Sequence, residues 1–232
     1  MINFSQDEVS AIYLSLKIAF VASLISLPFA VSLGYIFARK DFLFKKFFLS
    51  LLNLPLVLPP VVTGYILLIT FGINGIIGKF LLKYFNYTFA FKWTGAALAC
   101  AIMGFPLMIR AIKIAIEMID IKHEEAAKTL GANKVIVFFT ITFPLALPGV
   151  VAGFALCFAR SLGEFGATVT FVSNIPGETQ TLSTAIYSFL QIPNGELMAM
   201  RLTIISVFIS ISSLVLSEMI LEKILKHKRE NS

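Results

Sequence analysis

The sequence predicts an all-α integral membrane protein with about five transmembrane helices. Of its 232 residues, 58% are hydrophobic and only 14% are charged, whereas a soluble domain is typically about half apolar and a quarter charged. Five apolar tracts each supply the roughly 20 helical residues that cross a bilayer core. The net charge of +6 comes from cations near the ends of these tracts and not from a basic, aromatic stripe, so a nucleic-acid partner is not expected.

Local features support each tract in turn. The five tracts are Ile12–Ala38, Phe47–Phe71, Ala90–Ile116, Phe143–Phe165 and Leu202–Leu221. Just before the first, Ser5 and Glu8 have the spacing of a capping box, which predicts a helix start there. Lys17 lies near the beginning of this tract, where its long side chain can reach the membrane interface.

The second tract is unusual in its prolines. Pro55, Pro59, Pro60 and Gly64 must disturb its hydrogen-bond ladder near the middle of the membrane. Broken helices are tolerated in lipid where protein or a watery cavity covers the freed backbone groups. The break therefore indicates either a gate or donor-lined passage, to which Pro59, Pro60 and Thr63 would belong, or a packing kink.

Small residues recur every four positions in the third and fourth tracts, which predicts faces for close helix contact. They are Ala96, Cys100 and Gly104 in the third tract, and Gly149, Gly153, Cys157 and Ser161 in the fourth. Arg160 and Glu164 are the charges well inside the fourth tract, and their i, i+4 spacing lets them pair. Such a pair either belongs to an anion path or gate, or neutralises itself within the bundle.

The fifth tract has one hydroxyl-bearing face, made by Thr203, Ser206, Ser210, Ser213 and Ser217. Hydroxyl donors could contact a dianion weakly enough to release it, or the same face could serve interhelical packing. Between the fourth and fifth tracts, residues 166–174 either prolong the fourth helix or fold back. Residues 181–191 resemble a short amphipathic helix.

The loop charges predict an orientation. Lysine and arginine gather in the first loop, around the third loop and in the tail, whereas residues 173–200 contain neither. The positive-inside rule then places the N-terminus outside and the C-terminus in the cytoplasm. We expect a single membrane domain over residues 1–232, with a core at about 10–222 and a basic cytoplasmic tail at 223–232.

A polar segment at residues 122–133 interrupts the apolar tracts on the predicted cytoplasmic side. Glu124 and Glu125 open a short helix that ends near Gly131, as the helix dipole and a left-handed C-cap favour. Ala126 and Ala127 leave one side without bulk, so another surface could approach closely. Pro144 then marks the start of the fourth span.

The spacing within this segment resembles the EAA loop of ABC importer permeases. Glu125-Ala126-Ala127, three residues, Gly131, nine residues, Ile141, one residue, Phe143 and Pro144 follow the pattern E-A-A-x3-G-x9-I-x-L-P, with phenylalanine replacing leucine. The resemblance implies a type I ABC importer transmembrane domain whose coupling helix docks on a separate ATP-binding subunit. It also implies that Glu125 and Gly131 are the most sensitive positions.

A second resemblance narrows the cargo. Residues 161–191, which include Gly163-Glu164-Phe165-Gly166 and Asn174-Ile175-Pro176, and residues 54–68 are similar to molybdate ABC permeases. Sulfate permeases carry a related tract, so molybdate, tungstate and sulfate stay open as substrates. The resemblance implies a prokaryotic cell-membrane complex of two permease copies, two ATPase subunits and an extracytoplasmic molybdate-binding protein, with no cofactor.

Two other classes of protein remain as alternatives. An enzyme is not expected, because no Ser/His/Asp set or metal cluster can assemble from the polar residues. No P-loop is present either: Gly72 and Gly78 are separated by five residues, and Phe80 stands where Ser or Thr would bind Mg²⁺. A secondary anion transporter or channel would not need a docking loop, and would often show paired repeats.

Overall fold

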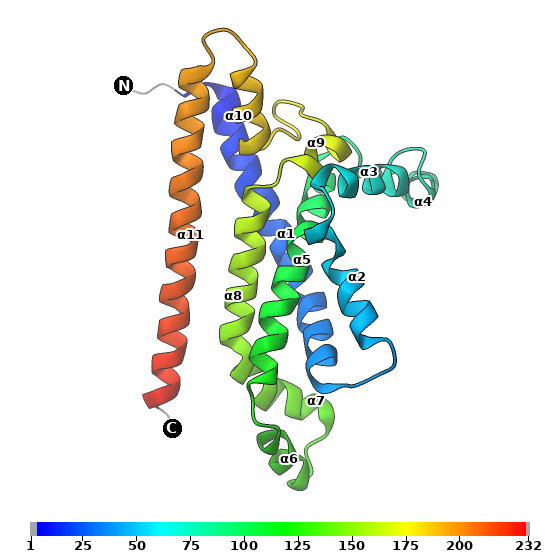
Figure 1. Cartoon of the computed structure of the whole chain (residues 1–232), viewed down its shortest axis with the longest axis vertical. Coiled ribbons are helices and arrows are strands. Elements are labelled where there is room, and N and C mark those ends of the chain that lie inside the picture. The colour runs from blue at the N-terminus through cyan, green and yellow to red at the C-terminus, as the bar shows by residue number, and fades with distance from the viewer. Residues whose placement is uncertain (1–3, 231–232) are drawn as a thin grey trace.

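The computed structural model describes residues 4–230, drawn in Figure 1. Within this range the helical elements are α1 (Gln6–Arg39), α2 (Lys45–Val57), α3 (Pro60–Phe71), α4 (Ile76–Phe85), α5 (Trp93–Glu117), α6 (Ile121–Thr129), α7 (Lys134–Val137), the π-helical segment η1 (Phe138–Thr142), α8 (Phe143–Leu162), α9 (Gly166–Val172), α10 (Leu182–Leu190) and α11 (Glu196–Glu230). The predicted all-α fold is confirmed.

Four helical runs in the described chain are long and apolar enough to cross a membrane, and a bent pair makes a fifth if it is counted as one span. The four are α1, α5, the continuous run Lys134–Leu162 and α11 as far as Ile224. They stand side by side in Figure 1, with the start of α1 at one end and α6 at the other. The expectation of about five membrane helices is therefore confirmed.

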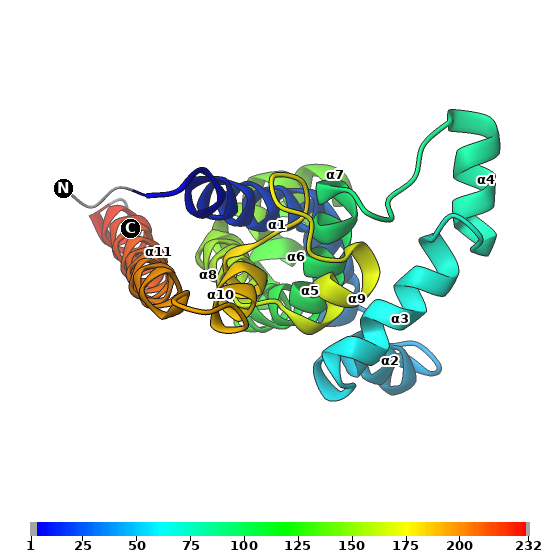
Figure 2. The same ribbon diagram turned by 90° about the horizontal axis from the view of Figure 1, so that it is seen from above.

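The second predicted tract is not a single straight helix. The structure breaks it between Val57 and Pro60, and the chain bends by 108° from α2 to α3. Leu58 and Pro59 are both extended, because a residue that precedes proline disfavours the helical region and proline cannot donate a helical hydrogen bond. Pro55 lies inside α2 without ending it. The bend sends α3 and α4 sideways from the bundle (Figures 1 and 2).

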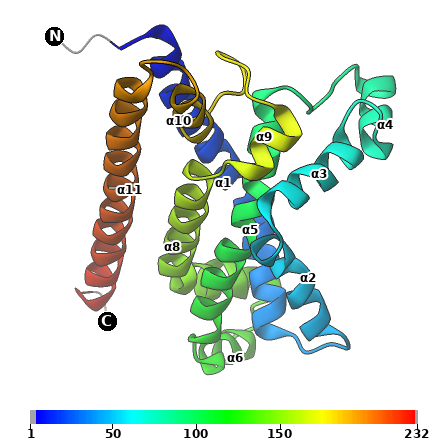
Figure 3. The same ribbon diagram turned by 45° about the horizontal axis from the view of Figure 1, so that its top comes forward.

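The centre of the bundle is formed by α1, α5 and α8 (Figures 1 and 3). The predicted small-residue faces meet there: a Cβ added to Gly104 on α5 would lie 2.5 Å from the Cys157 sulfur on α8. A Cβ on Gly153 would lie 3.0 Å from the Met108 carbonyl oxygen. Glycine at these positions lets the two backbones approach closely, so the packing interpretation is confirmed.

The helix that contains η1 begins earlier than expected. Pro144 was predicted to mark the start of the fourth span, but the chain is already helical at Lys134. Pro144 falls in the first turn of α8, and the Phe143 N–H donates to the Phe138 carbonyl, five residues back. Proline has no N–H to continue the i→i−4 ladder, and the wider π turn carries the helix through this point.

The outer helix α11 is longer than its predicted tract. It includes residues 223–230, which were expected to form a separate basic tail, while residues 231–232 of that tail lie outside the described part. One end of α11 is attached to α1: the fully buried Glu8 carboxylate pairs with Arg201 at 3.0 Å. Glu8 also completes the predicted capping box with Ser5.

The region after α8 folds back and does not prolong it. Gly163 ends α8, the short α9 follows in a new direction, and α10 lies beside α11 (Figures 1 and 3). Leu182 and Ala185 of α10 pack with Leu202 of α11 in one buried cluster. The expectation of a short helix near residues 181–191 is confirmed.

Candidate functional site

The polar segment forms a short helix at the tip of the bundle. Asp120 caps its start by accepting a hydrogen bond from the Lys122 N–H at 3.0 Å. Gly131, at φ +89°, follows its end and lets the chain reverse, as a left-handed C-cap requires. The helix α6 covers Ile121–Thr129, slightly shorter than the predicted range 122–133. It lies at the same end as the last turns of α11 (Figure 1).

The two adjacent glutamates of α6 point to different surroundings. Glu124 is buried, with 2% of its surface exposed. Its Oε1 accepts a hydrogen bond from Arg39 Nε at 2.8 Å and another from the Thr142 hydroxyl at 3.0 Å. Arg39 also donates to the Ile119 carbonyl at 2.9 Å. Glu124 therefore ties α6 to the end of α1 and to η1, whereas Glu125 is exposed.

The exposed side of α6 is suited to another protein surface. Glu125 and Ala126 are exposed, Ala127 is half-buried, and Leu130 at the end of the helix is 88% exposed. A Cβ on Gly131 would meet nothing within 4 Å. The exposed leucine shares this short helix with an exposed carboxylate and small residues. A complementary cleft on another protein would remove its apolar surface from water.

Sequence reasoning missed four residues of this site. Asp120 carries the ordinary N-cap signal, an aspartate directly before a helix, and Leu130 stands out as a large apolar residue in a polar segment. Arg39 and Thr142 had no local signal, because they lie 85 and 18 residues from Glu124. Only the folded chain brings these groups together.

A second group of predicted residues meets at the other end of α8. The guanidinium of Arg160 pairs with the Glu164 carboxylate at 2.7 Å, and Glu164 is 1% exposed. The other Glu164 oxygen accepts a hydrogen bond from the Ala167 N–H at 2.8 Å, which caps the start of α9. A Cβ on Gly166 would lie 2.8 Å from Pro60 Cβ, so this corner contacts the bend before α3.

The bend residues lie against α9. Gly64 of α3 approaches so closely that a Cβ there would lie 2.6 Å from the Ala167 carbonyl oxygen. Thr63 is buried, and its hydroxyl has no hydrogen-bond partner among the described residues. Pro59, Pro60, Thr63, Arg160 and Glu164 are thus gathered around one corner built from α3, α8 and α9.

The hydroxyl face of α11 lies elsewhere. Ser206, Ser210 and Ser213 are half-buried on α11, which packs against α8 on the side of the bundle away from α3 (Figures 1 and 2). Ser213 borders a cavity of about 400 Å³ that is lined chiefly by apolar side chains, including Phe154 and Phe158. Neither Arg160 nor Thr63 lines this cavity.

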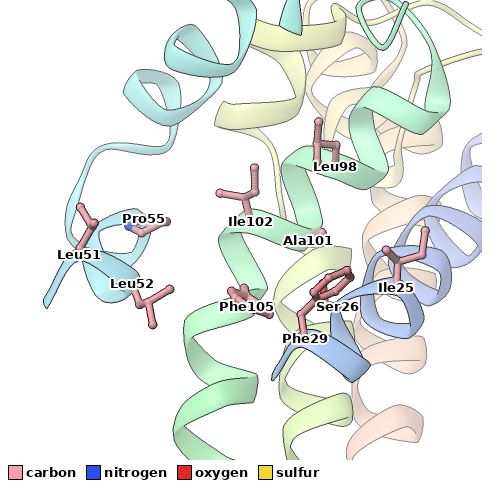
Figure 4. A pocket seen from close by; sticks show the side chains of 10 residues that line it. All are labelled: Ile25, Ser26, Phe29, Leu51, Leu52, Pro55, Leu98, Ala101, Ile102 and Phe105. Atoms are coloured by element: carbon pink, nitrogen blue, oxygen red, sulfur yellow. The ribbon is translucent and has the colours of Figure 1, made fainter. Parts of the chain in front are cut away.

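A further cavity lies between α1, α2 and α5 and is drawn in Figure 4. It has a volume of about 340 Å³, and its lining is apolar apart from Ser26. Phe29, Leu52 and Phe105 form part of its wall. Ser26 is the one polar side chain in this lining, and a single hydroxyl does not make an oxyanion site. Among the described residues, no group of three His, Cys, Asp or Glu is placed to hold a metal.

The sequence that forms this membrane bundle and its protruding polar helix matches a known protein family. The family of binding-protein-dependent transport system inner membrane components matches residues 30–226. The chain belongs to this family. As an inner membrane component, it crosses the membrane several times, in agreement with its long apolar helices.

Relatives of this membrane component are close in sequence. It is 53% identical, over 94% of this chain and 96% of the relative, to a molybdenum transport system permease protein (ModB) of Haemophilus influenzae. A sulfate transport system permease protein (CysT) of Escherichia coli is more distant, at 37% identity over 79% of this chain and 66% of the relative.

Solved structures show the same fold at low sequence identity. A bacterial ABC transporter that imports the acidic polysaccharide alginate superposes with a TM-score of 0.74 at 14% identity, over 95% of this chain and 80% of that chain. The inward-facing MetNI methionine ABC transporter gives a TM-score of 0.70 at 14% identity, over 93% and 95% of the two chains. The fold is that of a type I ABC importer transmembrane domain.

Proposed function

We propose that this chain is the membrane-spanning permease subunit of an ATP-driven importer that translocates molybdate delivered by an extracytoplasmic binding protein. The observation that carries the proposal is the 53% identity to a molybdenum transport permease over nearly the full length of both chains. The sulfate permease relative is 37% identical over a shorter part, which favours molybdate over sulfate. Tungstate has the same shape and charge as molybdate, so we expect it to compete for the same path.

In this proposal α6 is the coupling helix, and a separate ATPase subunit holds it. Two features support this role. The exposed Glu125, Ala126 and Leu130 offer a compact docking surface, and Glu124 ties the same helix to α1 and η1. A short helix fixed to spans in this way can pass nucleotide-driven movement of a partner to the bundle. Gly131 follows the end of α6, and Pro144 lies in the first turn of α8.

We further infer that two copies of the chain work together, with two ATPase subunits on the α6 side. The helix α2 has no buried residue in the single chain, and it borders the apolar cavity of Figure 4. A second copy would cover such surface. The cationic loops support an orientation with the start of α1 outside and α6 with the end of α11 in the cytoplasm.

The corner made by Pro59, Pro60, Thr63, Arg160 and Glu164 is the better candidate for a gate. Its backbone break and its unpartnered buried Thr63 hydroxyl support that role, because irregular backbone at membrane depth is tolerated where it lines a path. Ser206, Ser210 and Ser213 are the weaker candidates, since the cavity that Ser213 borders is lined chiefly by apolar side chains.

Reconstitution tests the function. The chain is purified with its candidate ATPase, placed in vesicles, and supplied with the binding protein and labelled molybdate. We expect uptake that needs ATP inside, stops with vanadate, and is competed by excess tungstate more strongly than by excess sulfate. Uptake by the chain alone that ignores vanadate would instead indicate a secondary transporter, and sulfate as the stronger competitor would make this a sulfate permease.

Crosslinking tests the docking surface separately. Cysteines at Ala126 and Leu130, introduced after both native cysteines are replaced, should form crosslinks to the ATPase in intact cells. Cysteines at Ile76 and Phe85, which bound α4 away from α6, should form none and serve as the control. Crosslinks from both sets, or from neither, would contradict the assignment of α6.

A further inference from the structure

A cavity of about 510 Å³ lies beside α6, between the end of α1 and the turn formed by α6, α7 and η1. Four cations line it: Arg39, Lys40, Lys128 and Lys134. The one carboxylate in its lining is Glu124. The family assignment and the coupling role proposed for α6 leave this cavity without a function.

The charge of the cavity is strongly positive. Arg39 and Glu124 neutralise one another through their 2.8 Å pair. Lys40, Lys128 and Lys134 are exposed, and among the described residues none of them has a carboxylate within salt-bridge distance. Three uncompensated ammonium groups around one concave surface attract an anion.

The rest of the lining is apolar. Phe139 and Val135 line the same cavity and are each 63% exposed, and Phe138 and Tyr35 complete this side. Phe138 and Phe139 belong to η1, at the start of the membrane-crossing run Lys134–Leu162. Exposed aromatic and aliphatic side chains that share one cavity with cations match the boundary between lipid headgroups and acyl chains.

We propose that this cavity binds the headgroup of an anionic phospholipid, with the phosphate among Lys40, Lys128 and Lys134 and an acyl chain along Phe139 and Val135. A free oxyanion would use the lysines but would leave the apolar wall in water, which is why a lipid fits better. The bound phosphate would bridge the end of α1, α6 and α7, because Lys40 directly follows α1, Lys128 lies in α6 and Lys134 begins α7. The lipid would therefore brace α6 beside the Arg39–Glu124 pair.

This inference needs only that the α6 end of the bundle lies at the membrane surface, and it does not depend on molybdate as cargo. The full-length chain is placed in nanodiscs of equal phosphatidylglycerol and phosphatidylcholine, released, and analysed by native mass spectrometry for retained lipid. Phosphatidylglycerol should be retained preferentially. Replacing Lys40, Lys128 and Lys134 together by Gln should lower its retention by about a hundredfold, since each cation near a membrane surface contributes about fivefold.

Two matched variants distinguish lipid binding at this cavity from a general effect of the net charge of the protein. Replacing the same three lysines by Arg keeps the charge and should keep the lipid. Replacing Lys79, Lys83 and Lys92 by Gln removes the same charge from the other end of the molecule and should also leave retention unchanged. Equal retention of the two lipids, or of phosphatidylglycerol by the wild type and the Gln variant at Lys40, Lys128 and Lys134, would overturn the proposal. Displacement of the lipid by excess inorganic phosphate would overturn it too, because it would mark a site for small oxyanions.

Discussion

Arg39, the last residue of α1, donates to the Glu124 carboxylate in the first turn of α6 across 2.8 Å. The side chains of this pair are 11% and 3% exposed, so the contact is largely shielded from water. The Thr142 hydroxyl of η1 donates to the same carboxylate oxygen. One glutamate thus fixes the protruding helix to two membrane helices, so a displacement of α6 must strain its contacts with both.

The same substitution at the two neighbouring glutamates should affect different properties: stability at Glu124 and ATPase binding at Glu125. Glu124→Gln should lower the free energy of unfolding by about 3 kcal/mol, because it leaves the Arg39 guanidinium buried without its counter-charge. Glu125→Gln should change it by less than about 0.5 kcal/mol, as surface substitutions usually do, but should weaken binding of the ATPase. Thermal unfolding in detergent and ATPase co-purification measure the two effects.

The charge-swapped variant Arg39→Glu with Glu124→Arg is the control for this pair. It should recover part of the stability that Glu124→Gln loses. The ratio of molybdate transported to ATP hydrolysed should also be higher in the swapped variant than in Glu124→Gln. If Glu124→Gln unfolds at the wild-type temperature, the pair does not anchor α6.

Gly131 should be sensitive because of its backbone and not because of crowding. Its φ of +89° disfavours any residue with a Cβ, although a Cβ there would meet nothing within 4 Å. Gly131→Ala should therefore cost about 1 kcal/mol through strain alone. Gly163→Ala is a matched control, since its Cβ is equally unobstructed but its φ is −89°. An equal loss of stability in both variants would exclude backbone strain as the cause.

The contact between α5 and α8 should not tolerate an added methyl group. Gly104→Ala brings a Cβ to 2.5 Å from the Cys157 sulfur, and should destabilise the protein by about 1–3 kcal/mol, as overpacking does. Adding Cys157→Ala removes the sulfur and should restore part of the loss. The unfolding temperatures of the two single variants and the double variant measure this coupling, and strictly additive effects would argue against direct contact.

The Arg160–Glu164 pair should behave as a structural unit of the α8–α9 corner. Arg160→Gln leaves the Glu164 carboxylate, 1% exposed, without its cation, and should cost about 3 kcal/mol. Combining it with Glu164→Gln should restore stability, because the amide oxygen can still accept from the Ala167 N–H. Uptake should recover together with stability. A stable double variant that has lost uptake would place Arg160 in the anion path.

The hydroxyls of α11 should be dispensable for transport. Ser213 borders an apolar cavity, and Ser210 lies one turn before it on the same half-buried face. Ser210→Ala with Ser213→Ala should leave both uptake and the unfolding temperature unchanged. A fall in uptake at an unchanged unfolding temperature would show that these hydroxyls contact the anion.

The contrast between Glu124 and Glu125 shows where sequence reasoning reached its limit. The sequence predicted a helix here from its acidic start and the glycine at its end, and the structure has it. Both glutamates looked alike, because their difference arises from Arg39, which lies 85 residues earlier. Helix period and capping are local properties of the chain, whereas the burial of a side chain depends on which element from elsewhere in the sequence packs against it.

The position of the break in the second tract also depended on the tertiary structure. Its prolines predicted a broken helix, but four positions were candidates for the break. The structure ends α2 at Val57, beside the pair Pro59 and Pro60, and keeps Pro55 within the helix. Two successive prolines restrict consecutive residues to extended backbone, while a single proline removes one hydrogen bond. The direction of α3 then depends on its contact with α9 through Gly64.

By itself, the sequence determined the class of protein, the approximate positions of its membrane helices and the polar helix between them, because hydrophobic length and helix end signals are encoded in neighbouring residues. The tertiary structure decided that Glu124 is an internal anchor, that the second span bends by 108°, and that the candidate path residues lie in two separate places. It also gathered three uncompensated lysines around one cavity. These features depend on contacts between residues far apart in the chain, and such contacts exist only once the helices have packed.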